Sequence, residues 1–415
     1  MQECKIISLS AFAKAVAAFL IMGLVSCKKD RPEKSNDHTP GPPPAVIIPS
    51  LAEVKSWLVD KNASDETAAL FYNLKKLSVT NILFGQQDAT KRGIINASTQ
   101  WANEQHLPPV SREKSDVKEI SGAYPAVYGH DFIHIANFED GNWFEYEAEI
   151  ARKLTIDAYN RGGVNTYAWH YSNPVSKGSF YWSDSPVKAV EHILPGGSQH
   201  QVFQNSLKTI ADFAKTLIGA DGKLIPVIFR PFHEMDGGWF WWGKGHCTPE
   251  QYKELFRFTV RYLRDELEVR NFLYCWSPGG EYNTTTQYLQ FYPGDDFVDI
   301  IGTDNYSLDN STPILIISNK LKIVSDYAKQ KNKIAAFTET GQQNLTISNW
   351  FTQKLLASLQ AQKLEMAFVL VWANTKEAFW TPYKGHQAEA DFIKFKQSSY
   401  VMFADEMPSV YKLSK

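Results

Sequence analysis

Short apolar segments alternate with longer amphipathic ones along the chain from Leu51 onward. The short segments are rich in β-branched and aromatic residues and mostly lack alternation of apolar and polar positions, which is typical of strands buried on both faces. They are Ile82–Phe84, Ala126–Ile133, Val164–Trp169, Leu224–Phe229, Phe272–Trp276, Val298–Ile301, Ile334–Phe337 and Ala367–Trp372. The pattern therefore predicts eight buried strands.

Helical patterns fill the intervals between these strands. One of them places apolar side chains three or four residues apart, at Phe203, Leu207, Ile210, Ala214 and Leu217. Gly219 follows this series and is predicted to end the helix. Strands that alternate with helices in this way predict a parallel sheet with right-handed crossovers.

Repeats of strand and helix can close into a barrel or remain an open, doubly wound sheet. An open sheet that binds nucleotides usually has a glycine-rich turn after its first strand. Here the first strand leads into Gly85-Gln86-Gln87-Asp88, and the sequence contains no G-x-G-x-x-G motif and no P-loop. We therefore predict an α/β fold of the (β/α)8 TIM-barrel type, in a single domain at residues 51–415, a length that suits such a barrel.

The first residues have the pattern of a targeting segment. Lys5 and Lys14 precede an apolar run from Ala15 to Val25, which is too short to span a bilayer, since spanning takes about 20 residues. A short apolar run that follows positive charge and precedes small residues is typical of a secretory signal. The ending Leu24-Val25-Ser26-Cys27 resembles the bacterial lipobox, in which the cysteine is lipidated. An ordinary signal peptide that contains a cysteine is the alternative.

These features predict how the whole chain is organised. Residues 1–26 are expected to be a lipoprotein signal peptide, and the proline-rich residues 27–50 an extended tether. A lipid on Cys27 is expected to anchor the protein in the bacterial cell envelope, at the outer membrane. The protein is expected on either the periplasmic or the outer face of that membrane. The segment Lys28-Lys29-Asp30 has no acidic cluster, which slightly favours the periplasmic face.

Composition excludes several classes of partner. The formal net charge is −2, so the charge balance does not favour nucleic acid or anionic lipid, both of which attract clusters of Lys and Arg. A neutral substrate fits this balance better. Beyond Cys27 the only cysteines are Cys247 and Cys275. A buried free thiol is favoured over a disulfide between them, and no Cys/His spacing resembles a zinc site.

Polar and aromatic residues collect directly after the predicted strands, where the active sites of such barrels lie. The clearest groups are Trp169-His170-Tyr171-Ser172-Asn173, Arg230-Pro231-Phe232-His233-Glu234, Trp276-Ser277-Pro278, Asp304-Asn305-Tyr306, Thr338-Glu339-Thr340 and Trp372-Ala373-Asn374. Aromatic residues also form the run Trp239-Phe240-Trp241-Trp242, which cannot point into one core as a whole. The carboxyl ends of the strands are therefore the predicted site.

Two glutamates at strand ends are the sharpest chemical feature. Glu234 follows the fourth predicted strand and Glu339 the seventh, and these strands lie on opposite sides of a closed barrel. Retaining glycosidases use two carboxyl groups about 5 to 5.5 Å apart, one protonated to donate to the leaving oxygen and one ionised to attack the anomeric carbon. A structural salt bridge is the alternative for either glutamate alone. Alternation along the fourth strand places Arg230, Phe232 and Glu234 on one side, so Arg230 can either hold Glu339 ionised or form a structural ion pair.

The residues around Glu234 carry a resemblance to a known family. The run Arg230-Pro231-Phe232-His233-Glu234-Met235-Asp236-Gly237-Gly238-Trp239-Phe240-Trp241-Trp242-Gly243 resembles the acid/base motif of glycoside hydrolase family 26. The similarity extends from about Ile82 to Asn374. That family consists chiefly of β-mannanases with a retaining mechanism on a (β/α)8 barrel. Its members have His before the acid/base glutamate, as His233 stands here, where most related families have Asn.

The resemblance implies roles for individual residues. Glu234 matches the acid/base and Glu339, in Thr338-Glu339-Thr340-Gly341, the nucleophile. The substrate-binding residues that it implies are His170, Trp182, His233, Trp239, Trp276, Tyr306 and Trp372. Two positions differ from many family members: Asp236 stands where they have Asn, and Ala373 where Arg often follows the tryptophan. Both differences affect the cleft and hence the fine specificity.

The activity that the resemblance implies is retaining hydrolysis of β-1,4-mannosidic linkages in mannan, galactomannan or glucomannan, by a monomer without metal or organic cofactor. The same fold and mechanism acting on mixed-linkage β-glucan or β-1,3-xylan is the first alternative. A glycan-binding lipoprotein without catalysis is another, which the presence of both glutamates disfavours. A phosphate-binding barrel would have glycine-rich turns after its last two strands, where only Gly341 lies. The long segment 172–200 leaves endo action and the release of mannobiose both open.

Overall fold

The computed structural model describes residues 48–103, 110–138 and 142–413. The predictions for the signal peptide, for lipidation of Cys27 and for most of the tether lie outside this part of the chain. The contacts group Ile47–Lys415 into one unit. Its helices are α1 (Leu51–Trp57), α2 (Asp65–Leu77), α3 (Asp116–Ser121), α4 (Asn142–Asn160), α5 (Val190–Ile193), α6 (His200–Lys215), α7 (Pro249–Arg261), α8 (Thr285–Tyr288), α9 (Ile314–Gln330), α10 (Ala357–Gln360) and α11 (Glu389–Lys396). Shorter π and 3-10 turns are η1 (Tyr262–Glu266), η2 (Leu289–Phe291), η3 (Asp295–Phe297), η4 (Gln343–Leu345) and η5 (Phe351–Leu356).

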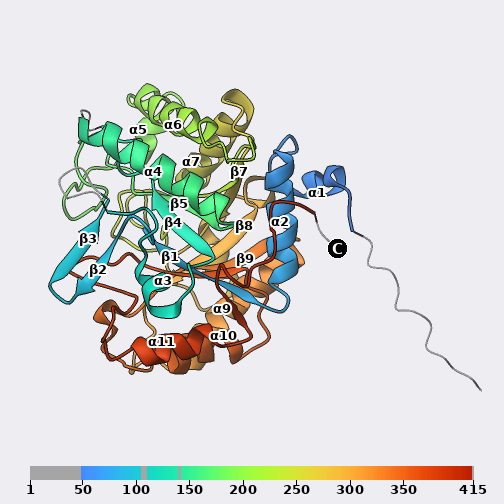
Figure 1. The fold of residues 1–415 in the computed structure, drawn as a ribbon. Helices are drawn as coiled ribbons and strands as arrows, with labels where there is room; N and C mark the ends of the chain where they lie inside the picture. The colour runs from blue at the N-terminus through green and yellow to red at the C-terminus, as the bar shows by residue number, and fades with distance from the viewer. Residues whose placement is uncertain (1–47, 104–109, 139–141, 414–415) are drawn as a thin grey trace, which may run out of the picture. The chain divides into compact units, whose positions relative to one another are not determined.

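Parallel strands form a closed barrel at the centre of this unit (Figure 1). They are β1 (Ile82–Gln87), β4 (Val127–Asp131), β5 (Val164–Trp169), β6 (Val227–Pro231), β7 (Phe272–Trp276), β8 (Ile300–Asn305), β9 (Ile334–Thr340) and β10 (Phe368–Val371). Each pairs with the next, and β10 pairs with β1 from Leu83↔Phe368 to Gln86↔Val371, which closes the cylinder. The predicted (β/α)8 fold and its eight strands are confirmed.

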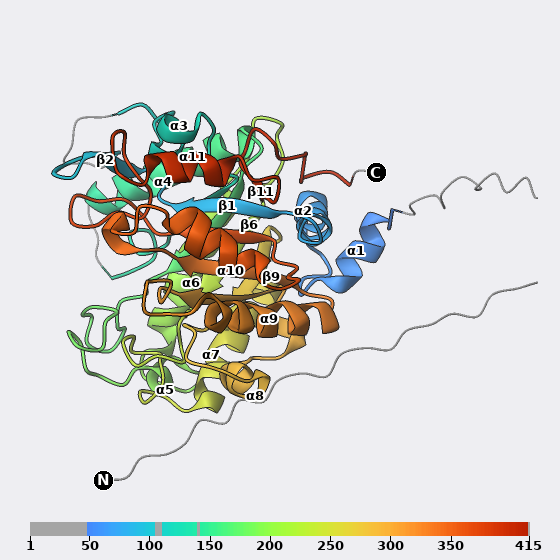
Figure 2. The same ribbon diagram turned by 90° about the horizontal axis from the view of Figure 1, so that it is seen from below.

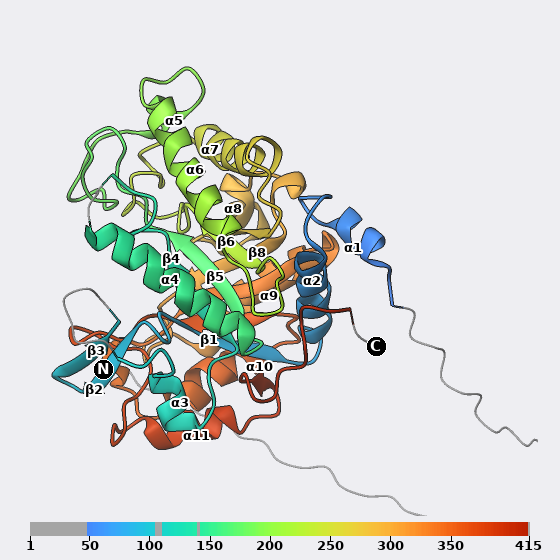
Figure 3. The same ribbon diagram turned by 45° about the horizontal axis from the view of Figure 1, so that its top comes forward.

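Two further sheet elements lie outside the cylinder. The hairpin of β2 (Arg92–Asn96) and β3 (Thr99–Ala102) follows β1 directly. The short strand β11 (Val401–Met402) pairs with the first residues of β1, and Figure 2 shows the two side by side. Helices cover the outside of the barrel; α4, for example, packs along β4 and β5, as Figure 3 shows.

Strand residues alternate between two hydrophobic layers, as the period of a strand requires. Residues such as Leu83, Ile228 and Cys275 point into the barrel, where they pack with the side chains of α1 and α2. Their neighbours, such as Phe229 and Trp276, point outward against the surrounding helices. Both faces are apolar, which explains why the strands show no alternation of polar and apolar residues in the sequence.

The helix predicted around Phe203 is confirmed as α6, whose buried face includes Phe203, Leu207, Ile210 and Ala214. The predicted stop at Gly219 is wrong, because α6 ends at Lys215. Gly219 instead lies in the following turn, where its N–H donates to the carbonyl of Lys223 at 2.9 Å. A Cβ at Gly219 would overlap the ring of Tyr159, so close packing explains the glycine.

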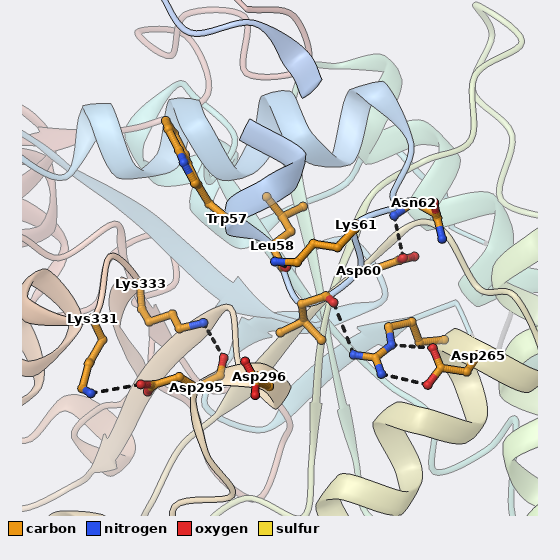
Figure 4. A pocket seen from close by; sticks show the side chains of 12 residues that line it. Trp57, Leu58, Asp60, Lys61, Asn62, Asp265, Asp295, Asp296, Lys331 and Lys333 are labelled. Atoms are coloured by element: carbon orange, nitrogen blue, oxygen red, sulfur yellow. Dashed lines mark hydrogen bonds and ion pairs between the residues drawn. The ribbon is translucent and has the colours of Figure 1, made fainter. Parts of the chain in front are cut away.

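The amino ends of the strands are closed by α1, α2 and the loop between them. The backbone N–H of Val59 in this loop donates to Asp299 Oδ1 at 2.8 Å, directly below β8. A cavity of about 450 Å³ lies beside the loop, and Figure 4 shows some of its charged side chains in ion pairs. Lys331 contacts Asp295 at 3.0 Å, and Arg264 contacts Asp265 at 2.7 Å.

Two further expectations concern cysteines and membranes. Cys247 and Cys275 are both free, so the prediction of unpaired thiols is confirmed, and Cys275 is buried inside the barrel. Among the residues that the structure describes, no helix is both long enough and apolar enough to cross a bilayer.

Candidate active site

A cleft of about 730 Å³ opens at the carboxyl ends of the strands. It brings together seven of the nine predicted catalytic and substrate-binding residues. The side chains that line it include His170, Tyr181, His233, Glu234, Trp239, Phe240, Glu281, Asp304, Tyr306, Glu339, Trp372 and Trp380. Glu234 and Glu339, more than 100 positions apart in the sequence, therefore border one cavity.

Glu339 is held by side chains from two other strands. Its Oε1 accepts from the guanidinium of Arg230, and its Oε2 accepts from the hydroxyl of Tyr306 at 2.9 Å. Arg230 is 3% exposed and also contacts Asp304 at 2.7 Å and Ser277 Oγ at 3.1 Å. A carboxylate whose two oxygens both accept hydrogen bonds from such donors is arranged as an ionised group. The predicted contact between Arg230 and Glu339 is present.

A bulge in β9 turns Glu339 toward the cleft. Toward β8 the pairing passes from Thr303↔Phe337 to Asp304↔Glu339, and toward β10 from Val369↔Phe337 to Val371↔Thr340. Both shifts add one residue to β9, at Thr338. Phe337 points outward into the helical layer, so simple alternation would send Glu339 outward as well. The extra residue reverses this direction, as bulges near active sites often do.

Unusual backbone geometry also directs Glu234. Phe232 and Glu234 have φ values of 51° and 56°, in the left-handed region that non-glycine residues rarely adopt. Phe232 packs in the outer hydrophobic layer, so the prediction that it shares a side with Arg230 and Glu234 is wrong. The N–H of Glu234 donates to the carbonyl of Ser277 at 2.8 Å, which fixes the turn to the end of β7. Strain of this kind is common where a reactive side chain must be aimed.

The environment of Glu234 favours its protonated form. Burial, followed by the nearby charge of Glu339, raises the pKa of Glu234 to about 7. The indole of Trp239 opposes this shift by donating its Nε1–H to Glu234 Oε2 at 2.6 Å. Gly237 permits this fold-back, because a Cβ there would overlap the ring of Trp239. Glu234 can therefore act as a proton donor near neutral pH.

Two histidines lie between the glutamates and β5. His233 is 1% exposed, its Nε2 lies 4.0 Å from Glu339 Oε1, and burial together with Arg230 and His170 lowers its pKa well below the usual value. His233 is therefore a neutral residue in the wall of the cleft. The ring of His170 lies 4.7 Å from that of His233, edge to face, and its Nδ1 contacts Asp131 Oδ2 at 2.5 Å.

One arrangement in the cleft also fits the spacing of metal ligands. Ligand atoms of His233, Asp304 and Glu339 lie within 4.8 Å of one another. Arg230 already donates to both carboxylates, so the positive charge that balances them comes from the protein itself. The donor set is therefore better explained by the guanidinium than by a metal ion.

Two predicted substrate residues lie away from the cleft lining. Trp276 is fully buried on the outward face of β7, where it packs against Tyr288 and Tyr292 at 5.1 Å, so its assignment to substrate contact is wrong. Trp182 stacks on His246 at 3.6 Å, and its backbone N–H donates to the carbonyl of Trp239 at 2.7 Å. Trp182 can thus affect the cleft through the Trp239 loop.

The structure adds residues that sequence reasoning missed. Trp380 lines the cleft, and its ring packs so close to Gly341 that a Cβ there would overlap it. Asn374 folds the loop back by accepting the N–H of Trp380 at 2.8 Å. Asp304 is linked to Glu339 through Arg230. Its place at a strand end was a usable signal for Asp304, whereas nothing local marks Trp380, which comes late in a loop.

Comparisons with known proteins agree with this geometry. The family model described as "Glycosyl hydrolase family 26" matches residues 59–392. The chain is 36% identical over 372 residues to a "Mannan endo-1,4-beta-mannosidase" of Bifidobacterium adolescentis, a match that covers 84% of this chain and 35% of the relative. A Bacillus subtilis protein with the same description is 28% identical, with 63% of this chain and 69% of the relative covered.

Solved structures give the same result. GH26C from a Muricauda species matches with a TM-score of 0.81 and 36% identity, covering 89% of this chain and all of the other. A GH26 β-mannanase from Bacteroides ovatus matches with a TM-score of 0.75 and 36% identity, covering 84% of this chain and 98% of the other. The chain belongs to glycosyl hydrolase family 26. It spans only about a third of the length of the Bifidobacterium relative.

Proposed function

We propose that the protein is a retaining glycoside hydrolase that cleaves β-1,4-mannosidic linkages in mannan-type polysaccharides. The observation that carries this proposal is the contrast between two carboxyl groups in one cleft. Glu234 has a pKa raised to about 7, whereas Glu339 accepts from Arg230 and Tyr306. A double-displacement mechanism needs one protonated and one ionised carboxyl group.

Each carboxyl group has one task at each step. Glu234 donates its proton to the oxygen of the departing sugar while a carboxylate oxygen of Glu339 bonds to the anomeric carbon. Glu234, now ionised, then removes a proton from water, whose oxygen attacks the same carbon and releases Glu339. Because two inversions occur, the product keeps the β configuration.

The choice of mannan rests on the family and on its members. Relatives that share 36% and 28% identity are described as mannan endo-1,4-β-mannosidases. Exposed aromatic surface in the cleft, from Tyr181, Trp239 and Tyr306, suits the flat C–H faces of sugar rings. The polar lining can donate to and accept from neutral hydroxyl groups.

A substrate panel tests the proposal. Purified protein would be incubated with mannan, galactomannan, mixed-linkage β-glucan and β-1,3-xylan, and reducing ends would be measured together with the anomeric configuration of the first product by NMR. We expect β-anomeric products from mannans and at least tenfold slower release from the others. Faster cleavage of glucan or xylan would make that polysaccharide the substrate in place of mannan. An α-anomeric first product would contradict the retaining mechanism.

We also propose that the protein is a monomer anchored to the cell envelope by a lipid on Cys27. Support comes from the sequence alone: the positive charges, the short apolar run and the Leu-Val-Ser-Cys ending. Cys27→Ala should shift the protein from the membrane to the soluble fraction of cells that produce it. Membrane association unchanged by this substitution would contradict the anchor, and light scattering of the purified domain would test the monomer.

A further inference from the structure

His170 stands where two cavities meet. It lines the cleft around the glutamates and also a neighbouring cavity of about 270 Å³ that extends toward β1 and β4. Rings surround its imidazole, with Phe180 at 4.8 Å and Trp372 at 5.8 Å between centroids. Polar groups therefore reach the imidazole from few directions.

Asp131, the last residue of β4, fixes His170 at two points. Its Oδ2 lies 2.5 Å from His170 Nδ1. Its Oδ1 accepts the backbone N–H of His170 at 3.1 Å and that of Ile133 at 2.8 Å. Ring and backbone of His170 are thus tied to one carboxylate, which leaves the imidazole a single orientation.

The other ring nitrogen, Nε2, is open to the cavity. Within the described part of the chain, the contact through Nδ1 is the ring's only hydrogen bond. Nε2 has no hydrogen-bond partner there and is not a buried atom. Since His170 lines the cleft, Nε2 is available to a ligand.

We propose that Asp131 is a positioning residue for the hydrolysis: its carboxylate accepts Nδ1–H and stabilises the cationic ring of His170, whose Nε2–H donates to a hydroxyl group of the sugar bound beside Glu339. This inference rests on the proposed function. Because the carboxylate always accepts Nδ1–H, the proton that His170 loses on titration is the one on Nε2. The cationic ring donates to the sugar, and the neutral ring can only accept.

Electrostatics support the cationic form. Burial alone would lower the pKa of His170, but the Asp131 carboxylate outweighs it, with a further contribution from Glu339, so the pKa is raised; Arg230 opposes the rise. The other titratable or charged groups around the two cavities are His233, Glu234, Tyr181, Glu281, Asp304, Tyr306, Asp309, Asp88, Lys91, Arg92, His130 and His134. Burial lowers the pKa of His130 and of His134 to about 4, so both are neutral when His170 is charged.

Ligand affinity as a function of pH tests this role. Glu234→Gln removes a second titrating group of the cleft, one with a pKa of about 7, and prevents cleavage. In that background, the dissociation constant of mannotetraose would be measured by calorimetry from pH 5 to pH 9. We expect affinity to fall about tenfold as pH rises and His170 loses its Nε2 proton, the size of one hydrogen bond from a charged donor.

Asp131→Asn is the decisive second substitution. The amide oxygen can still accept both backbone N–H groups, but its NH2 cannot accept from Nδ1. The amide NH2 instead donates to Nδ1, so the neutral ring of this variant carries its proton on Nε2 and still donates to the sugar. We therefore expect the fall in affinity with rising pH to disappear. Asp299→Asn is the matched control, a buried carboxylate at the other end of the barrel that should leave the curve unchanged. Superimposable curves for the Asp131→Asn and control proteins would overturn the inference.

A third variant covers the case in which Asp131→Asn does not fold. His170→Gln keeps Asp131 and removes the titrating ring, so affinity in the Glu234→Gln background should become independent of pH. Persistence of the original pH dependence in this variant would overturn the inference. Failure of the proposed function looks different: the Glu234→Gln protein would still cleave mannan or would bind no mannotetraose at any pH.

Discussion

Strand β8 has a buried aspartate at each end, and the two differ in what they contact. Asp299, at the amino end, accepts the backbone N–H groups of Val59 and Tyr274 at 2.8 and 2.9 Å. Asp304, at the carboxyl end, contacts the side chain of Arg230, which in turn contacts Glu339. Both side chains are fully buried, and burial raises the pKa of each, that of Asp299 to about 6.

The comparison separates structural charge from functional charge. At the amino end a carboxylate ties chain segments together, and the nearby cavity contains the ion pairs Lys331–Asp295 and Arg264–Asp265. At the carboxyl end the carboxylates are held by side chains that border an open cleft. The carboxylate of Asp299 accepts backbone N–H groups and so stabilises the fold. The carboxylate of Asp304 contacts a side chain that also holds Glu339 at the cleft. Substitutions at the two ends should therefore affect different properties.

The largest effect is expected at Glu339. Glu339→Gln removes the attacking carboxylate but keeps its shape, so kcat on mannan should fall about 10⁴-fold or more. The thermal midpoint should change by only a few degrees, since the amide can keep one hydrogen bond. Initial rates and calorimetric scans measure the two quantities. Activity within tenfold of the unsubstituted protein would remove Glu339 from the mechanism.

The two aspartates of β8 provide a direct test of the comparison. Asp304→Asn should lower kcat/KM about 10²-fold or more, because Arg230 loses an anionic partner and no longer holds Glu339 in place. Asp299→Asn should leave kcat/KM within about twofold but lower the free energy of unfolding by about 1–3 kcal/mol, since one backbone N–H loses its acceptor. Kinetics and urea unfolding on both variants suffice. A loss of activity in Asp299→Asn together with a loss of stability alone in Asp304→Asn would contradict the structural role of Asp299 and the functional role of Asp304.

A smaller effect concerns pH and Glu234. With a pKa raised to about 7, Glu234 is protonated below that pH, so kcat/KM should fall as pH rises through about 7. Trp239→Phe removes the N–H that stabilises the ionised form, so the pKa should rise further and the alkaline limb should move to higher pH. The pH profile of kcat/KM on a mannooligosaccharide measures this shift. Movement to lower pH would contradict the proposed role of the indole.

The smallest effects on activity are expected at the tryptophans away from the cleft. Trp276→Phe should leave KM within about twofold while lowering stability by about 1–3 kcal/mol, because the indole is buried against the helices. Trp182→Ala should change KM by no more than about threefold, since it contacts the cleft only through the Trp239 loop. Trp372→Ala is the matched comparison, and its KM should rise about tenfold or more.

The amino-acid sequence by itself determined the number and order of the strands, the barrel, and the position of the chemistry at strand ends. Short apolar runs and a helical period of about 3.6 residues are local properties, and Glu234, His233 and Glu339 directly follow or end apolar runs. The family was also visible in one continuous motif from Arg230 to Gly243. All of these features are carried by residues close to one another in the chain.

Only the tertiary structure decided which way the side chains point. Strands buried on both faces are apolar throughout, so their sequence does not mark which alternate residues face inward, and Trp276 proved to face outward. The bulge at Thr338 and the left-handed backbone at Glu234 then override alternation altogether. Both features depend on how neighbouring strands pair. That pairing is made by contacts between segments that are distant in sequence, so it cannot be read from a local pattern.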